Sequence, residues 1–173
     1  MAEVFKNLDR AASAAAQWRQ ERPDIDPFPM ELLGRVGEIT QIIIRDRLNP
    51  FFMQHGLQSG EFDVLATLRR SGAPYELTPT QLYEAAMLSS GGMTARIDRL
   101  ERDGLVVRRR HPTDRRGTLV ALAPKGLSLI DAMLAEHVEN ERSALAGLTK
   151  FEQEQFNALT IKLLASIKDL PKR

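Results

Sequence analysis

The segment TARIDRLERDGLVVRRRHPTDRRG, residues 94–117, concentrates positive charge in a short part of the chain. It holds eight arginines, at positions 96, 99, 102, 108, 109, 110, 115 and 116, against four acidic residues, at positions 98, 101, 103 and 114. The whole chain of 173 residues carries a formal charge of only +1. Because the distribution of charge identifies nucleic-acid binding better than its total does, this segment indicates a polyanionic partner.

The elements around this segment follow from capping and periodicity signals. Thr-Pro-Thr-Gln at the start of 78–87 is a capping box with proline at the first helical position, and it predicts a short helix. A second short helix follows, with Ser90 as its expected cap, and it ends at Asp103-Gly104. Alternating side chains predict strands at 105–110 and 118–122, which a polar tip joins. Two short helices followed by a basic hairpin form the pattern of a winged helix-turn-helix.

The rest of the chain is predicted to be helical. Apolar residues at helical spacing predict helices over 1–22, from Met30 to about Asn49-Pro50, and from Ser59 to Ser71. A long helix is expected from Pro124 to about Leu145, and a capping box at Thr149–Glu152 begins the last one. The fold class is therefore mainly α, a winged helix-turn-helix with a two-stranded β-wing, an N-terminal helical extension and a helical dimerisation region.

These elements divide into an extension over residues 1–29 and a winged-helix domain over 30–173. Within the domain we expect the winged helix-turn-helix at 57–124 and dimerisation helices at 30–56 and 125–170. Those outer helices carry more apolar positions than one small winged-helix domain can bury alone. A two-fold homodimer is therefore expected, and it would bind half-sites about one helical turn apart.

The second short helix and the tip carry the residues suited to double-stranded DNA. A capped helix N-terminus offers N–H groups to phosphate. Glycine lowers helix propensity by about 1 kcal/mol relative to Ala. Two glycines at this N-terminus therefore indicate that the backbone approaches its partner closely. Arginines at an exposed tip fit the negative potential of the minor groove. The expected DNA contacts are Ser90, Gly91, Gly92, Thr94, Arg99, Arg115 and Arg116. One alternative stays open, because Arg99 and Arg102 could form a solvated helix face. Asp114 is interpreted as a local brace for the tip and its guanidinium groups.

Composition and spacing exclude several other chemistries. The chain has no cysteine, so disulfides, thiolate metal sites and cysteine-based peroxide sensing are excluded. Its three histidines, His55, His111 and His137, are far apart in the sequence and lack a second ligand at metal spacing. No nucleophile–base arrangement or phosphate-binding glycine loop is recognisable. No apolar run is long enough to span a membrane. We expect no catalytic site, no bound metal or cofactor, no membrane partner, and a cytoplasmic location.

The basic segment and its continuation resemble the MarR family of bacterial transcription regulators. The shared pattern comprises Leu100-Glu101, Gly104-Leu105, Arg108, Asp114-Arg115-Arg116, Leu122 and Lys125-Gly126. One departure is Ala123, where that family usually has a threonine cap. The resemblance covers roughly residues 30–170. It implies a homodimeric, sequence-specific DNA-binding repressor whose first and last helices interdigitate between subunits.

The N-terminal extension, with AAQWRQERPDIDPFP at 15–29, resembles a smaller branch of that family, the urate-responsive regulators of the PecS and HucR type. That resemblance implies a ligand set of Trp18, Asp63, Arg96 and Arg108, and an effector that is urate or a related purine. The two arginines would bind anionic oxygens, the carboxylate would accept from ring N–H groups, and the indole would pack on the ring.

Each of these four residues also has a structural interpretation. Trp18 could anchor the added helix, Asp63 could favour the helix dipole or pair with Arg96, and Arg108 could contact phosphate. Two other functions stay open: a repressor that responds to a phenolic ligand, and a ligand-independent DNA-binding dimer. We expect Trp18→Ala or Asp63→Ala to lower the ligand response while operator binding remains, and Arg116→Ala to weaken DNA binding alone.

Overall fold

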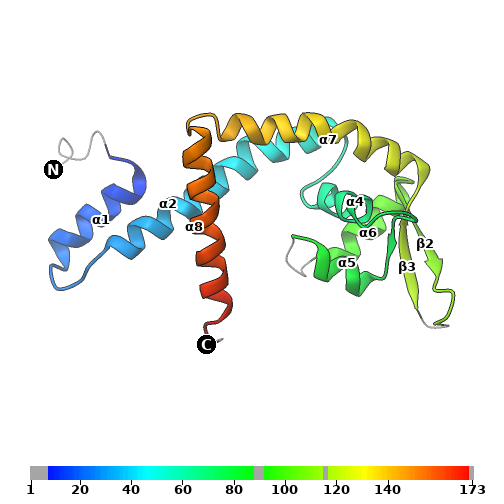
Figure 1. Ribbon diagram of the computed structural model, residues 1–173, viewed down its shortest axis with the longest axis horizontal. Helices are drawn as coiled ribbons and strands as arrows, with labels where there is room; N and C mark the ends of the chain where they lie inside the picture. Colours follow the sequence, from blue (N-terminus) through cyan, green and yellow to red (C-terminus); the bar gives the residue numbers. More distant parts are fainter. Residues whose placement is uncertain (1–7, 88–91, 115–116, 172–173) are drawn as a thin grey trace. The chain divides into compact units, whose positions relative to one another are not determined.

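The computed structural model describes residues 8–87, 92–114 and 117–171 (Figure 1). The chain forms two compact units, one up to Pro50 and one from Phe51 onward. The predicted division into an extension over 1–29 and a winged-helix domain over 30–173 stays a prediction. Among the described helices none is both long and apolar enough to cross a membrane.

The first unit is built on two packed helices, α1 (Arg10–Glu21) and α2 (Phe28–Ile43). The carboxylate of Asp9 caps α1 by accepting the N–H of Ala12 at 2.8 Å. The two helices approach closely where both have small residues. Ala11 and Ala15 are buried, and a Cβ on Gly34 would lie 3.6 Å from that of Ala11. The predicted helix over 1–22 is thus confirmed from residue 10, and residues 1–7 lie outside the described part.

The prediction that the second helix ends near Asn49-Pro50 is wrong. The chain stays helical through a π-helical segment, η1 (Ile44–Leu48), and into α3 (Asn49–Gln54). The N–H of Asn49 bonds to the carbonyl of Ile44, five residues back, so the wider turn precedes the proline. Pro50 is the second residue of α3 and lies directly after this wider turn.

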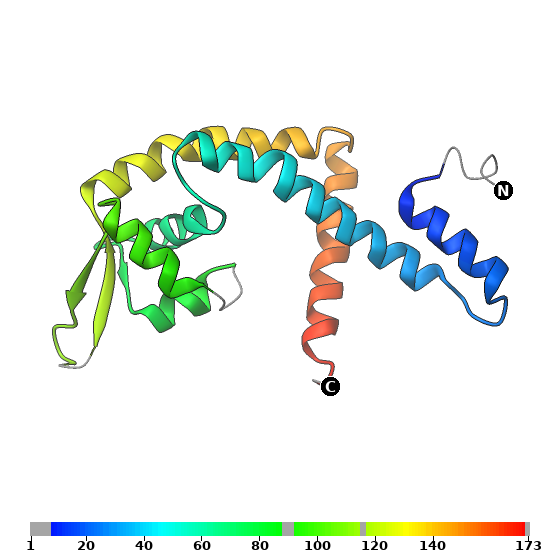
Figure 2. The same ribbon diagram turned by 180° about the vertical axis from the view of Figure 1, so that it is seen from behind.

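The second unit contains the winged helix-turn-helix. Its helices are α4 (Glu61–Arg70), α5 (Pro79–Ala85), α6 (Met93–Arg102), α7 (Pro124–Ala144) and α8 (Lys150–Lys168), and its strands are β1 (Glu76–Leu77), β2 (Val106–Arg110) and β3 (Thr118–Leu122). The fully buried apolar side chains come from each of these elements except β1 and α8, and they include Leu65, Leu82, Leu100, Val120 and Ile130. Figures 1 and 2 show the β2–β3 hairpin projecting beyond α4, α5 and α6.

The sheet has three antiparallel strands in the order β1-β3-β2, one more than the predicted two. The wing strands are confirmed in place, with Arg108 opposite Val120 in their register. The additional strand β1 has only two residues and pairs Glu76 with Ala121. Two residues are too few to show alternation, so the pattern of the sequence contained no signal for β1.

Of the three helix starts for which the sequence predicts a capping side chain, two agree with the structure. The capping boxes of Thr78 with Gln81 and of Thr149 with Glu152 are both formed. The expectation that Ser90 caps the second short helix is wrong, because α6 begins at Met93 and its N-cap is Gly92, with φ 85°. That left-handed conformation suits glycine, which adopts it without strain. Ser90 and Gly91 themselves lie outside the described residues.

Candidate nucleic-acid interface

Helix α6 is held by one apolar face and exposes the other. Met93, Ile97 and Leu100 recur at helical spacing and are buried, and α6 packs against α4. Thr94, which was predicted to contact DNA, lies outside this apolar face and is exposed. This is the arrangement that a recognition helix needs, because its polar side must remain free for the major groove.

The wing tip is closed by hydrogen bonds centred on His111. Its ring Nδ1 lies 3.2 Å from the N–H of Asp114 and 3.4 Å from that of Thr113. The N–H of Gly117 donates to the carbonyl of Asp114 at 3.0 Å, and that of His111 donates to the carbonyl of Gly117 at 3.0 Å. These hydrogen bonds tie His111 to Thr113, Asp114 and Gly117 within the described part of the tip. Arg115 and Arg116, the predicted minor-groove contacts, lie outside the described residues.

Arg108 lies at the base of the wing and is held by α6. Its guanidinium group pairs with the carboxylates of Asp98 and Glu101, and its backbone N–H donates to Glu101 at 3.0 Å. Burial lowers the pKa of Arg108, but the hydrogen bonds to Asp98 and Glu101 outweigh burial and raise that pKa above its ordinary value. Arg108 thus links the wing to the recognition helix, and an anionic ligand there has to compete with two carboxylates.

Asp63, another predicted ligand residue, is bonded to the main chain of the helix-turn-helix. It lies in the first turn of α4, and its Oδ2 accepts the N–H of Met87 at 2.8 Å. Met87 follows Ala86, the C-cap of α5, at the start of the turn of the helix-turn-helix. Asp63 therefore connects α4 to that turn, a role that its position in the sequence did not suggest.

Arg96 extends from α6 over two glycines of left-handed conformation. A Cβ on Gly60 would lie 2.5 Å from the Nε of Arg96, and one on Gly92 would lie 3.6 Å from its Nη1. Both glycines have positive φ, 83° and 85°. Arg96 also lines a hollow of about 260 Å³, whose other lining residues are Gln58, Ser59, Glu61, Gly92, Ala95 and Arg99. Among the four predicted ligand residues, Arg96 is the member that lines this hollow.

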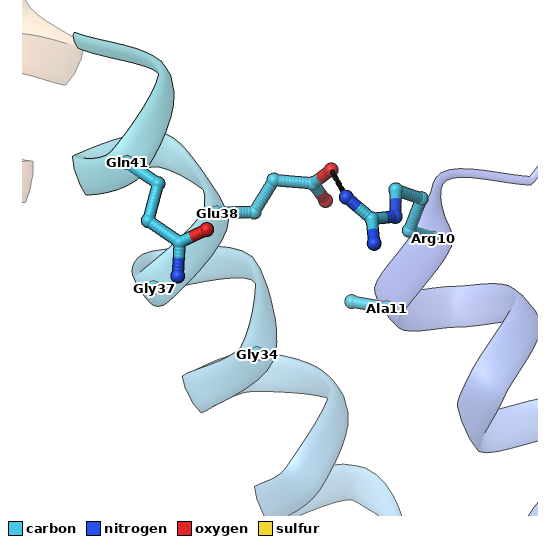
Figure 3. A pocket seen from close by; sticks show the side chains of 6 residues that line it. All are labelled: Arg10, Ala11, Gly34, Gly37, Glu38 and Gln41. Atoms are coloured by element: carbon cyan, nitrogen blue, oxygen red, sulfur yellow. Dashed lines mark hydrogen bonds and ion pairs between the residues drawn. The ribbon is translucent and has the colours of Figure 1, made fainter. Parts of the chain in front are cut away.

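Trp18 belongs to the first unit, where its side chain is 42% exposed on α1. That unit has a hollow of its own, of about 400 Å³, lined by Arg10, Ala11, Gly34, Gly37, Glu38 and Gln41 (Figure 3). Arg10 and Glu38 face each other across it with a separation of 3.4 Å. Trp18 does not line this hollow.

Two residues have environments that the sequence analysis did not anticipate. Glu61 is a charged residue that is only 1% exposed. In the sequence, an acidic residue in the first turn of a helix predicts only a favourable interaction with the helix dipole. His137 was not assigned a packing role, but its ring lies against those of Phe51, Phe52 and Phe62, with centroid separations of 5.9, 5.9 and 4.3 Å. Within the described part of the chain, no three acidic or histidine side chains are grouped to hold a metal ion.

A helix pair followed by a two-stranded wing, with the polar side of the second helix exposed, defines a winged-helix DNA-binding protein. The family model described as MarR family matches residues 55–117. The HTH-type transcriptional regulator PecS of Dickeya dadantii is 41% identical over 143 residues, which cover 83% of this chain and 86% of that protein. The chain therefore belongs to the MarR family of DNA-binding transcriptional regulators, and not to a family of enzymes.

Solved structures show the same fold. A putative MarR-like transcription regulator from Bacillus cereus has a TM-score of 0.70 and 25% identity, and the match covers 79% of this chain and 95% of that one. A mutant MarR from Escherichia coli, complexed with operator DNA, has a TM-score of 0.68 and 24% identity, with coverage of 85% and 97%.

Proposed function

We propose that this protein is a homodimeric repressor that binds a pseudo-palindromic operator and is released from it by urate or a related purine. The observation that carries the ligand part is the position of Arg96, which extends from the recognition helix into a hollow beside Ser59 and Glu61. A ligand that binds Arg96 contacts the same element that has to enter the major groove. Such a ligand lowers DNA affinity to the extent that it prefers the conformation not bound to DNA.

Two exposed helices support the dimer. Neither α2 nor α8 has a buried residue. The exposed apolar side chains of α8 are Phe151, Phe156, Leu159, Ile161, Leu163, Leu164 and Ile167, and those of α2 include Phe28, Leu33, Val36 and Ile39. Apolar surface of this extent is typical of a protein interface. A second copy of the chain would cover it in a closed two-fold assembly.

The chemistry of the other predicted ligand residues is compatible with an anionic purine. Arg108 adds a second guanidinium group near α6, and Asp63 adds a carboxylate that accepts from N–H donors. Both already have protein partners, so ligand binding would exchange one set of hydrogen bonds for another. This exchange is a route by which the ligand could loosen the wing and the turn before α6.

Calorimetric titration of the purified protein with urate is the direct test. We expect saturable binding near one urate per subunit, displacement of operator DNA at the same concentrations, and loss of the binding heat in Arg96→Ala. Arg116→Ala is the matched control, because we expect it to weaken operator binding while urate affinity is unchanged. Binding of a phenolic compound with no heat from urate would favour a phenol-responsive repressor. Absence of any ligand effect on DNA binding would favour a ligand-independent dimer.

A further inference from the structure

Glu61 is a buried charge at the start of α4, and both of its carboxylate oxygens have partners. Oε1 lies 3.1 Å from the Nε of Arg99, and Oε2 accepts the N–H of Gln58 at 2.5 Å. The side chain of Glu61 is only 2% exposed. A carboxylate so far removed from water remains charged only when its partners replace the lost hydration. The burial of Glu61 therefore depends on its ion pair with Arg99.

Arg99 in turn is directed toward the protein more than toward solvent. Its side chain is 33% exposed, and besides Glu61 it approaches Asp103 of its own helix at 3.8 Å. Arg102, three residues further along α6, differs: it is exposed and forms no ion pair within the part of the chain that the structure describes. Two arginines of the same helix thus occupy different environments, although the sequence alone makes them look equivalent.

The apolar face of α6 determines which side of the helix meets the core. Contacts of Met93, Ile97 and Leu100 with the core are non-directional, however, and they do not tie α6 to one particular group of another helix. An ion pair with a buried carboxylate does so, because moving the guanidinium group away would leave that carboxylate buried without a counter-charge. The Glu61–Arg99 pair thus ties α6 to α4 at one position, and Glu61 is itself fixed by the main chain at Gln58.

We propose that Arg99 is a positioning residue, which sets the orientation of the recognition helix through Glu61 and does not act as a DNA contact. Base edges are recognised by side chains whose positions depend on the rotation of α6, whereas phosphate attraction depends mainly on the number of cations present. Loss of the pair therefore lowers the preference for the operator and leaves general affinity for DNA nearly unchanged. This inference rests on the family and its DNA-binding function, and it is independent of the effector.

The test compares operator DNA with a scrambled duplex of the same length across a range of salt concentrations. The operator is first selected from a pool of random duplexes by the parent protein. We expect Arg99→Met to reduce the ratio of operator affinity to scrambled-duplex affinity at least tenfold, with the salt dependence of scrambled-duplex binding unchanged. Arg102→Met removes the same charge from the same helix, and we expect it to leave that ratio within twofold of the parent. The proposal is overturned if Arg99→Met lowers the affinity for both duplexes equally and the slope of the salt dependence falls by about one. That result would show that Arg99 contacts a phosphate.

A double variant distinguishes loss of the Glu61–Arg99 pair from an effect on folding. Arg99→Met leaves Glu61 buried without its partner and lowers stability, but a smaller folded fraction reduces binding to both duplexes alike and leaves their ratio intact. Glu61→Gln combined with Arg99→Met removes the buried charge and the pair together, and circular dichroism verifies its fold. We expect this folded double variant to show the same reduced ratio as Arg99→Met. A double variant with the parental ratio contradicts a positioning role.

Discussion

At the scale of single residues, the charge of the segment 94–117 is shared between DNA and the protein itself. Arg108 is held by two acidic residues of α6, Arg99 by Glu61, and Arg109 lies 3.7 Å from Glu76. Some of these arginines thus form ion pairs with acidic residues inside or outside the segment, although the net charge of the segment alone suggests that they bind nucleic acid. The number of cations available to phosphate is therefore smaller than the number of arginines, and ion-pair partners decide which remain.

The hydrogen bond from Met87 to Asp63 changes what we expect of Asp63→Ala. That variant loses both the charge and the acceptor, so operator affinity should fall about threefold to tenfold, the effect of one hydrogen bond of about 1 kcal/mol. Asp63→Asn keeps an acceptor oxygen for the N–H of Met87 and should bind the operator like the parent. Fluorescence anisotropy with labelled operator measures both. Equal operator affinity in the Ala and Asn variants would show that this hydrogen bond does not support the helix-turn-helix.

At the scale of elements, the start of α7 is fitted closely to the connection between α6 and β2. Lys125 donates through Nζ to the carbonyl of Asp103 at 2.9 Å, where α6 ends. The N–H of Ala123 donates to the carbonyl of Leu105 at 3.0 Å. Ala123 provides no side-chain cap, so these contacts anchor α7 instead. The lysine of the Lys-Gly pair in the sequence pattern thus connects the start of α7 to the end of α6.

A substitution at Gly126 tests how closely the start of α7 packs against the connection between α6 and β2. A Cβ at this position would lie 2.0 Å from the carbonyl oxygen of Leu105, and backbone cannot move aside as a flexible side chain does. We expect Gly126→Ala to lower the free energy of unfolding by about 1–3 kcal/mol, measured by urea denaturation. Gly147→Ala is the control, because nothing lies within 4 Å of its Cβ, and its effect should stay within about 0.5 kcal/mol. Similar stability of the two variants would mean that the α7 start adjusts freely.

The pairing of α1 with α2 should depend on pH through exposed ion pairs. The hydrogen bond from Arg35 lowers the pKa of Asp9 below its ordinary 3.8, and hydrogen bonds from Arg35 and then Arg19 lower the pKa of Glu31 below its ordinary 4.5. For carboxylates with lowered pKa values, the stabilisation is complete above the ordinary values and disappears as the pH falls through the lowered ones. The association of α1 with α2 should therefore weaken at acidic pH.

Fluorescence of Trp18, the single tryptophan of the chain, reports this association because it lies on α1. We expect Arg35→Gln to differ from the parent at neutral pH and to converge with it as the pH falls through the range of the lowered pKa values. Arg45→Gln removes a pair with the adjacent Asp46 that does not join the two helices, so it should match the parent throughout. A pH-independent difference between Arg35→Gln and the parent would contradict the ion-pair account.

At the scale of the whole molecule, the apolar faces of α2 and α8 predict a dimer. Leu159 is 65% exposed on α8, and a charge there would be buried in the proposed interface. We expect the parent to sediment at twice the mass of its 19.4 kDa chain, and Leu159→Glu to sediment as a monomer with weakened operator binding. Asn157→Glu adds the same charge at an exposed polar position of α8 and should remain dimeric. A dimeric Leu159→Glu would place the interface elsewhere.

Features that depend on neighbouring residues could be predicted from the sequence. They are both capping boxes, the two long wing strands, the long α7 and the family pattern from Leu100 to Gly126, and each depends on side chains a few positions apart. Which charged groups meet depends instead on how the helices pack. Asp63 and Met87 are 24 residues apart, and Arg99 belongs to a different helix from Glu61. Packing of α6 on α4 brings these groups together, and residue spacing within either helix does not encode that contact.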